Sequence, residues 1–346
     1  MMHETVALER SSETGQENTA GHDLIVVGAS AGGIDALKVI VSGLPANLPA
    51  AVLVVVHISP NSPRLLADIL NRAGPLPCQY AQDQDVIRRG HLYLAPPNKH
   101  LMVEPARLRV VQGPRENRAR PAIDPLFRTA AVAYGPRTVG VILSGNLNDG
   151  TAGLIAVKRA VGIAIVQDPK DALYPSMPQS ALEAVEVDYA VPLAEMPSVL
   201  LKVIDQPVPA QTATLLPHEQ EETALVRDAD RGRQRAAMIG TPSAFVCPDC
   251  GGGLYEIENA PLWRFRCRVG HAFTAEVLRA GKAEVLEQAL WLALRTLEEK
   301  IELHRRMVQR AAERGLASMA SQWQEDIRDM EQQIDLLGQI LYPEKS

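Results

Sequence analysis

The feature that most constrains this chain is a repeated alternation between short apolar runs and helix-like stretches from Asp23 to about Asp205. Strands that are apolar at nearly every position must be covered on both faces, which is typical of a parallel sheet between two layers of helices. We therefore expect an α/β domain with a doubly wound, mostly parallel sheet over residues 23–205. The expected strands are 24–27, 52–56, 139–143 and 163–166, and the expected helices are 33–41, 65–72, 124–133 and 153–161.

Three segments depart from this alternation. Short pieces at 91–95, 101–104 and 107–111 predict a small antiparallel hairpin on the edge of the sheet. Residues 1–22 are polar, without the basic and then apolar pattern of a signal peptide, and predict a disordered tail. Residues 206–244 are rich in Pro, Gln, Glu, Arg and Ala, which predicts a linker. We expect this linker to let the modules after it lie well away from the carboxyl ends of the strands, and docking of these modules over those ends is the alternative.

The size and composition of the chain limit the classes of protein to which it can belong. A length of 346 residues favours two or three folded units. The net charge of −6 argues against a role in nucleic-acid binding, which needs clustered positive charge. No apolar run reaches the roughly 18–20 residues that span a bilayer, so we expect no membrane insertion. Three of the four cysteines lie between 247 and 267, which favours a metal site in a reducing compartment, and we expect a cytoplasmic protein.

A serine follows the first expected strand directly, because Ser30 lies within the run of small residues 28–33. Small neighbours permit the sharp bend that lifts a hydroxyl above a sheet, and amides at the start of the next helix can stabilise an oxyanion. A nucleophile is therefore one interpretation. A phosphate-binding loop and simple tight packing are the alternatives, although the G-x-G-x-x-G spacing and the Gly-Lys-Ser/Thr ending are missing.

Two further polar residues follow strands of the same expected sheet. His57 ends the strand 52–56, and Asp149 follows the strand 139–143 within an Asn/Asp/Gly cluster. A structural histidine and a simple turn are the alternative interpretations. Because functional groups gather beyond the carboxyl ends of parallel strands, we expect Ser30, His57 and Asp149 to meet there. A hydroxyl, an imidazole and a carboxylate are the groups that a serine nucleophile, its base and the orienting acid require.

Residues 23–204 carry a resemblance to a known family. They resemble the catalytic domain of the CheB-type chemotaxis protein-glutamate methylesterases, and the matching pieces occur in the family's order over about half of the chain. These pieces are residues 27–33, 55–57, 90–97, 120–127, 148–150 and Met177-Pro178.

The resemblance implies a function and a set of site residues. Ser30 would be the nucleophile, His57 the base and Asp149 the orienting acid of an esterase without a catalytic cofactor. The substrate would be methyl-glutamyl residues of a receptor or other signalling protein, and glutamine deamidation would be a related activity. The resemblance also implies oxyanion donors from the backbones of Ala31 and Asn146, and substrate contacts at Gly32, Gly33 and Met177.

The chain departs from the usual pattern of this family at three positions. Leu147 stands where the family usually has a glycine, Val56 replaces a common glutamine, and Ser176 replaces a glycine. Well-known members also begin with a phospho-accepting receiver domain, whereas only residues 1–22 precede the first strand here. We therefore expect no control by aspartyl phosphorylation within this chain.

A cysteine-bearing segment follows the expected linker. Cys247 and Cys250 form a C-x₂-C pair, and Cys267 and His271 form a C-x₃-H pair. Three thiolates and an imidazole at this spacing predict a tetrahedral structural Zn²⁺ in a ribbon over residues 245–273, and metal would supply most of the folding energy of so small a segment. Unbound cysteines and a redox C-x-x-C are the alternatives. Cys78 stands apart, and we expect it to be buried.

The rest of the C-terminal region is less specific. Arg264, Arg266 and Arg268 alternate along an expected strand of the ribbon, where they favour a solvated face over a surface for nucleic acid or an acidic protein. Residues 274–342 predict a helical hairpin that breaks near Gly315. Its second helix carries an apolar seam from Met319 to Leu341 that predicts packing within the chain or self-association with a second copy.

Three functions are compatible with these patterns. The first is a methylesterase of protein glutamate esters, which the complete Ser/His/Asp set favours. The second is a non-catalytic signalling adaptor that keeps the esterase fold as a docking surface. The third, a small-molecule carboxylesterase, is disfavoured because no lid or apolar acyl pocket is evident in the sequence.

Overall fold

The computed structural model describes residues 21–209, 222, 240–257 and 262–342. Contacts divide the chain into two compact units, Met1–Phe245 with Gly252–Thr274 and Val246–Gly251 with Ala275–Ser346. None of the helices in the described ranges is both long and apolar enough to cross a membrane. Most of the predicted tail (1–22) and linker (206–244) lies outside the described residues.

A seven-stranded parallel sheet forms the centre of the first unit, in the order β3-β4-β2-β1-β7-β8-β9. Its inner strands are buried at nearly every position, which explains their continuous apolar sequences. The strands are β1 (Leu24–Ala29), β2 (Ala51–Val56), β3 (Cys78–Tyr80), β4 (Leu92–Leu94), β7 (Thr138–Ile142), β8 (Ile163–Gln167) and β9 (Tyr189–Val191).

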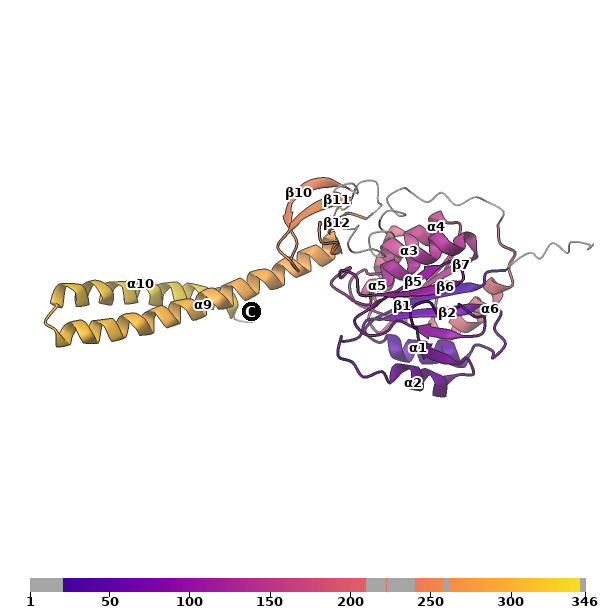
Figure 1. Ribbon diagram of the computed structural model, residues 1–346, viewed down its shortest axis with the longest axis horizontal. Helices are drawn as coiled ribbons and strands as arrows, with labels where there is room; N and C mark the ends of the chain where they lie inside the picture. Colours follow the sequence, from indigo (N-terminus) through magenta and orange to yellow (C-terminus); the bar gives the residue numbers. More distant parts are fainter. Residues whose placement is uncertain (1–20, 210–221, 223–239, 258–261, 343–346) are drawn as a thin grey trace, which may run out of the picture. The chain divides into compact units, whose positions relative to one another are not determined.

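Helices cover both faces of this sheet (Figure 1), so the predicted doubly wound α/β fold is confirmed. One apolar core lies between the sheet and α1 (Gly33–Ser42), α2 (Leu66–Ala73) and α6 (Met196–Ile204). The other core lies between the opposite face and α3 (Ile123–Tyr134), α4 (Thr151–Arg159) and α5 (Ser176–Ala184). Two short 3₁₀ turns, Gly135–Arg137 and Leu193–Glu195, complete these layers.

The predicted edge hairpin is partly wrong. Residues 92–94 form β4, a strand within the parallel sheet, because they pair with β2 and β3. The hairpin consists only of β5 (His100–Glu104) and β6 (Arg107–Val111), which form a separate two-stranded antiparallel sheet. Leu101, Val103 and Leu108 belong to the same buried core as α3, so this small sheet covers a helix and does not extend the edge of the large one.

A second sheet follows, in the order β10-β11-β12-β13. Its strands are β10 (Thr241–Val246), β11 (Gly253–Ile257), β12 (Arg264–Cys267) and β13 (Ala272–Thr274). The β12–β13 hairpin, residues 264–274, is antiparallel and belongs to the same compact unit as the parallel sheet.

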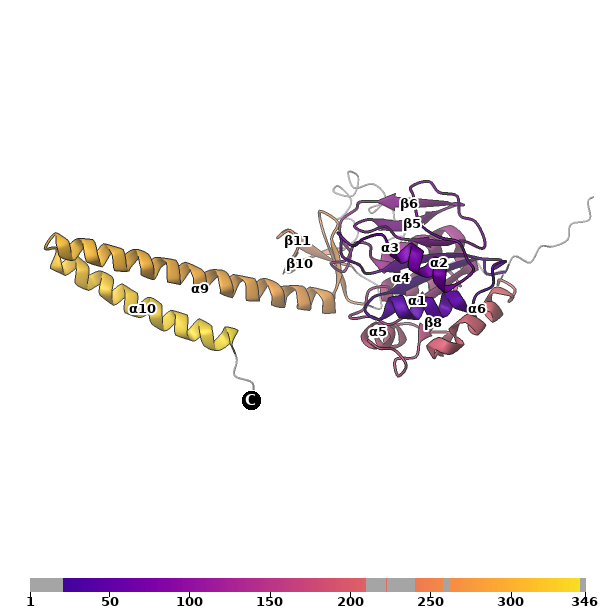
Figure 2. The ribbon, with the colours of Figure 1, turned by 90° about the horizontal axis from the view of Figure 1, so that it is seen from below.

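Two long helices occupy most of the second unit. They are α9 (Ala275–Glu313) and α10 (Ala317–Leu341), which pack side by side as a hairpin (Figure 2). Gly315 adopts a left-handed φ of 70° in the turn between them, at the predicted break. On the predicted seam of α10, Met330 is buried, whereas Met319 is 46% exposed. Self-association through these helices stays a prediction.

Candidate active site

The turn that carries Ser30, the predicted nucleophile, lies at the carboxyl end of β1, next to the turn that follows β7. Ser30 donates its backbone N–H to the Ser144 carbonyl at 3.0 Å, and Gly33 donates to the Ser30 carbonyl at 2.9 Å. Gly32 has a left-handed φ of 74° at the start of α1. The strands that follow β1 directly in the sequence lie on one side of it, whereas β7, β8 and β9 lie on the other side. The turn after β1 is therefore at the switch point of the sheet, where parallel sheets bind ligands.

Ser30, His57 and Asp149 form one hydrogen-bonded chain. His57 Nε2 lies 2.7 Å from Asp149 Oδ2, and its Nδ1 lies 3.2 Å from Ser30 Oγ. The carboxylate can only accept, so Nε2 carries the proton and Nδ1 is left to accept from the Ser30 hydroxyl. The imidazole is partly exposed, at 21% of its side chain, whereas the carboxylate is buried. This arrangement provides the three groups that a serine nucleophile, its base and an orienting acid require.

Asp149 is held ionised by several donors. Besides His57, its carboxylate accepts from the Ile123 amide at 2.7 Å and from Asn117 Nδ2 at 2.9 Å. Burial alone would raise the pKa of Asp149, but the hydrogen bond and charge of His57, the Ile123 amide and Asn117 lower it below its usual value. The acid therefore stays negative and can stabilise a protonated imidazole.

Two neighbours of Asp149 were not predicted as site residues from the sequence. Asn117 Nδ2 donates both to Asp149 and to Asp124 Oδ2, in each case at 2.9 Å. Burial and the nearby charge of Asp149 raise the pKa of Asp124 to about 7. Asp124 belongs to the 120–127 motif that carried the family resemblance, whereas Asn117 lies outside every motif, and no sequence signal indicated its role.

The residues predicted as oxyanion donors, Ala31 and Asn146, lie beside Ser30. Gly145 approaches Ser30 so closely that a Cβ added to Gly145 would lie 2.8 Å from the Ser30 Cβ, and this contact brings the 144–146 turn against the nucleophile turn. No hydrogen bond runs from the Ala31 or Asn146 amide to a protein acceptor in the described part of the chain. Both amides therefore remain usable by a substrate oxygen.

Leu147 keeps the backbone conformation that a glycine would adopt in this loop. Its φ is 62°, in the left-handed region, and its side chain is 41% exposed. The Ser176 hydroxyl donates to the Leu147 carbonyl at 3.1 Å, so two departures from the family pattern contact each other. A left-handed φ costs a residue with a side chain roughly 1–2 kcal/mol of conformational energy, so this loop is strained at Leu147.

The three predicted substrate-contact residues have different environments. Gly32 is partly exposed beside the Ser144 hydroxyl, and its role stays a prediction. Gly33 is buried against Ala29. Met177 is fully buried and packs against Gly145, so direct contact of its side chain with a substrate does not fit this structure. Through its contact with Gly145, the Met177 side chain supports the 144–146 turn.

A cleft of about 350 Å³ opens beside His57. Its lining includes three arginines, Arg115, Arg118 and Arg120, and none of the described residues that line it is acidic. Burial and the charge of Arg115 lower the pKa of the Arg120 guanidinium. The lining of the cleft is therefore electropositive.

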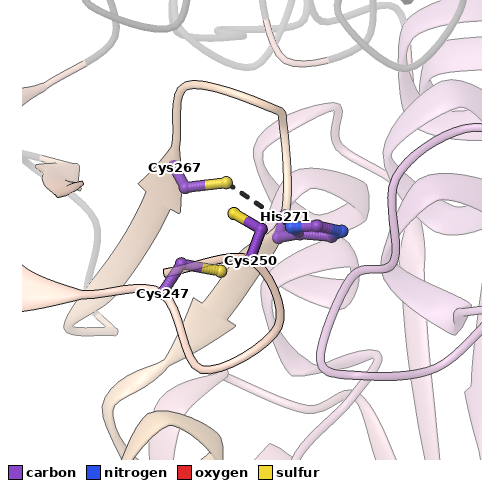
Figure 3. Close-up of side chains that lie close together, drawn as sticks. All are labelled: Cys247, Cys250, Cys267 and His271. Atoms are coloured by element: carbon purple, nitrogen blue, oxygen red, sulfur yellow. Dashed lines mark hydrogen bonds between the residues drawn. The ribbon is translucent and has the colours of Figure 1, made fainter. Parts of the chain in front are cut away.

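The four predicted metal ligands lie together (Figure 3). Their ligand atoms all lie within 4.8 Å of one another, and Cys267 Sγ is 3.6 Å from His271 Nδ1. Tetrahedral zinc with Zn–S bonds of about 2.3 Å separates its ligand atoms by roughly 3.8 Å, so the cluster could hold a metal ion. Cys78 lies elsewhere and is buried as predicted, and burial raises the pKa of its thiol to about 12.

The prediction of a solvated arginine face is wrong for two of its three residues. Arg268 is exposed, but Arg264 and Arg266 are 6% and 1% exposed and form ion pairs with Glu222. Arg266 also pairs with Glu116 of the first domain at 2.9 Å. Glu222, within the predicted linker, is thus buried, and the β12–β13 hairpin is not held away from the first domain.

Ser30, His57 and Asp149 meet at the switch point of a parallel α/β sheet and provide the hydroxyl, imidazole and carboxylate that a serine hydrolase requires. The comparisons with known proteins give the family. Residues 25–200 match the family model described as CheB methylesterase, and the chain belongs to this family of ester hydrolases.

Named relatives agree with this assignment. The chain is 38% identical over 183 residues to a putative protein-glutamate methylesterase/protein-glutamine glutaminase of Leptospira interrogans, covering 53% of this chain and 95% of that protein. It is 34% identical over 186 residues to a protein of Pyrococcus abyssi named protein-glutamate methylesterase/protein-glutamine glutaminase, covering 52% of this chain and 50% of the relative. The crystal structure of the Thermotoga maritima CheB methylesterase catalytic domain is 32% identical, with a TM-score of 0.51, and covers 53% of this chain and 98% of that chain.

Proposed function

We infer that this protein hydrolyses methyl esters of glutamate side chains on a signalling protein through an acyl-Ser30 intermediate. The observation that carries this proposal is the continuous hydrogen-bonded chain from Ser30 Oγ through His57 to the ionised Asp149. The names of the relatives, which combine methylesterase and glutaminase, support both the ester substrate and a second reaction on glutamine.

The reaction proceeds in two steps, acylation and then deacylation of Ser30. Ser30 Oγ attacks the ester carbonyl carbon while His57 Nδ1 takes the hydroxyl proton, and collapse of the tetrahedral intermediate returns that proton to the departing methanol. A water molecule then loses a proton to His57 Nδ1 and attacks the acyl-serine. As the acyl bond to Ser30 Oγ breaks, His57 returns this proton to Oγ, and the released glutamate acid ionises to its carboxylate. Asp149 stays ionised throughout and stabilises the imidazolium. With a glutamine substrate the leaving group is ammonia.

The amides of Ala31 and Asn146 are the proposed oxyanion donors. The Ala31 amide belongs to the nucleophile turn, and the close approach of Gly145 to Ser30 supports the assignment of the neighbouring Asn146 amide. Because a backbone donor does not depend on the side chain, asparagine at 146 is compatible with this role.

The electropositive cleft supports an acidic polypeptide as the substrate. Arg115 is exposed at its rim, and a neighbouring carboxylate of the substrate chain would interact favourably with it. Replacing Arg115 by Ala should raise KM on a methylated protein severalfold and leave kcat/KM on a small methyl ester unchanged. Arg88→Ala removes an equal charge outside the lining of this cleft and serves as the control.

A structural Zn²⁺ is the proposed occupant of the Cys247, Cys250, Cys267 and His271 cluster. Four protein ligands would complete its tetrahedral coordination, so it would stabilise the fold and take no part in the reaction. Elemental analysis should find about one zinc ion per chain, and freely reactive native thiols at these three cysteines would contradict this assignment.

Labelling with a fluorophosphonate together with methanol release from a methylated receptor protein tests the esterase proposal. The full-length protein should be labelled at Ser30 and should release methanol, and Ser30→Ala should do neither. Ser42→Ala, on the exposed end of α1, is the matched control and should behave as the wild type. An unlabelled wild-type protein that releases no methanol would show that the catalytic assignment is wrong.

A further inference from the structure

The loop that carries Asn117 is bonded to a segment outside the family's catalytic domain. The family model ends at residue 200, whereas the β12–β13 hairpin comprises residues 264–274. Asn117 donates its backbone N–H to the Ala272 carbonyl at 2.7 Å, and Ala272 donates its own N–H to the Arg115 carbonyl at 3.3 Å. Glu116 and Ala272 thus form a parallel bridge, so β13 gains the 115–117 segment as a short additional neighbour.

These backbone bonds hold the loop in an uncommon conformation. Asn117 and Arg118 both have left-handed φ values, of 49° and 62°. Asparagine tolerates this region better than most residues, but two such residues in succession require surrounding contacts to maintain them. The hydrogen bonds to Ala272 supply contacts of this kind.

The side chain of Asn117 is held by the same hairpin. Its Oδ1 accepts from the Thr274 N–H at 3.1 Å, while its Nδ2 donates to Asp149 and Asp124. The carbonyl oxygen is therefore bound to the hairpin, and both amide protons are directed at the two carboxylates. The Thr274 hydroxyl also donates to Asn148 Oδ1 at 2.7 Å, next to the triad acid in the sequence.

A buried ionic cluster anchors the hairpin beside this contact. Arg266 bonds to Glu116 and Glu222, and Arg128 of α3 bonds to Glu116 from the other side. All four side chains are at most 2% exposed. Gly270 packs against Pro114, where an added Cβ would lie 2.7 Å from Pro114 Cγ. The hairpin is therefore fixed on both sides of the Asn117 contact.

From this geometry we propose that Asn117 is a positioning residue for Asp149, and that Thr274 of the β12–β13 hairpin holds this arrangement in place through its N–H to Asn117 and its hydroxyl to Asn148. The hairpin is then an integral part of the esterase site, supplied from a region beyond the catalytic domain that the family shares. This inference rests on the proposed function, because it assigns a role toward the triad acid. Loss of the Asn117 donors would leave Asp149 less well oriented and easier to protonate.

The rate at which a fluorophosphonate labels Ser30 in the full-length protein tests this proposal without the natural substrate. Asn117→Ala should lower the second-order labelling rate on the order of 10- to 100-fold, the usual effect of losing a hydrogen bond to a charged group. The acid limb of the rate against pH should also move to higher pH, because the carboxylate loses a donor. If Asn117 only stabilised the fold, Asn117→Ala would reduce the fraction of protein that is folded and labelled, but the dependence of the labelling rate on pH would not change.

Variants of Thr274 test the contribution of the hairpin. Thr274→Val removes the hydroxyl bond to Asn148 but keeps the backbone N–H to Asn117 and the shape, so it tests the hydroxyl contact and should lower the labelling rate roughly fivefold. Thr274→Ser keeps the hydroxyl and should restore most of the rate. Ser243→Ala removes a hydrogen bond within the second sheet, to the Leu254 carbonyl, and should have no effect.

The outcomes separate the two proposals. If the wild-type protein is not labelled at Ser30, the proposed function fails. If it is labelled, but Asn117→Ala keeps the wild-type rate and pH profile, the positioning role is wrong. If Asn117→Ala is impaired while Thr274→Val matches the wild type, the assignment of the Thr274 hydroxyl is wrong. Should Asn117→Ala not fold, the comparison of Thr274→Val with Thr274→Ser decides.

Discussion

Arg266 and Glu116 are 150 residues apart in the sequence, yet Arg266 Nη2 lies 2.9 Å from Glu116 Oε1, and each residue is 1% exposed. The Glu116 carboxylate is shared with Arg128, and Arg266 also reaches Glu222. A buried ion pair adds little net stability compared with apolar packing. Removing one partner, however, leaves the other charge unpaired in the protein interior, which solvates it poorly. The pair therefore ties the β12–β13 hairpin to the first domain.

Replacing Arg266 by Met should be strongly destabilising. The substitution keeps much of the side-chain length but leaves the charges of Glu116 and Glu222 less well compensated, so we expect a loss of about 3–5 kcal/mol in the free energy of unfolding. Denaturant melts of the full-length protein measure this loss. Arg268→Met, on the exposed side of the same hairpin, should change stability by less than about 0.5 kcal/mol. Equal effects of the two variants would contradict the ionic anchor.

The ionic cluster should make the protein sensitive to acid. Although burial opposes ionisation, Arg128 and Arg266 lower the pKa of Glu116 to about 2, below its ordinary 4.5. A lowered pKa contributes stability that is present above pH 4.5 and is lost as the pH falls toward 2.

Unfolding free energies measured from pH 5 to pH 2 test this dependence. Glu116→Gln should be less stable at pH 5 and should show a shallower decline on acidification. Asp124 acts in the opposite direction, because its raised pKa contributes stability that is lost as the pH rises from about 4 to about 7. The pKa values of Glu222, Asp149 and Asp23 are also lowered, so below pH 4 it is the difference between Glu116→Gln and the wild type that reports Glu116. An unchanged acid slope in Glu116→Gln would mean that this carboxyl is not the responsible group.

His57→Ala should abolish esterase turnover about as completely as Ser30→Ala. Triad members act as a unit, so each single variant should lose at least about 10³-fold in kcat, and the double variant should lose little more. Both side chains are partly exposed, and the thermal midpoint should change little. Additive losses in the double variant would show that the two residues do not share one proton-transfer path.

Chelation of the proposed zinc should expose thiols and weaken the active site together. Cys267 and His271 flank the turn that leads into β13, so loss of metal should loosen the hairpin that holds Asn117. We expect Cys247, Cys250 and Cys267 to become reactive and the labelling of Ser30 to slow. Cys78 is the internal control, since its burial in the parallel-sheet core should keep it unreactive. Reactive thiols with an unchanged labelling rate would separate the metal site from the active site.

Leu147→Gly tests the strained loop beside the nucleophile. Glycine removes the cost of the left-handed φ, about 1–2 kcal/mol, but adds roughly 0.5–1 kcal/mol of unfolded-chain entropy. The variant should therefore gain up to about 1 kcal/mol in unfolding free energy and keep its activity. Leu147→Ala retains a Cβ and should show no such gain. A loss of activity in the glycine variant would indicate that the leucine side chain takes part in substrate binding.

Local patterns in the sequence determined much of the catalytic domain. Continuous apolar runs predicted the inner strands β1, β2, β7 and β8, because a strand buried on both faces needs apolar residues throughout. The position of Ser30, His57 and Asp149 after three such strands predicted their meeting, since parallel strands end at one edge. The spacing of the cysteines and His271 likewise predicted the cluster of possible metal ligands.

Tertiary structure alone decided the rest. Short strands such as β4 carry no signal for the sheet they join, because their partners are set by contacts distant in sequence. The alternation of Arg264 and Arg266 looked like a solvated face, since a sequence does not reveal that Glu116 and Glu222 neutralise them from other segments. Asn117 likewise acquires its role only where folding brings β13 against its loop. The partners of charged and polar groups are set only when segments that are distant in the sequence pack together.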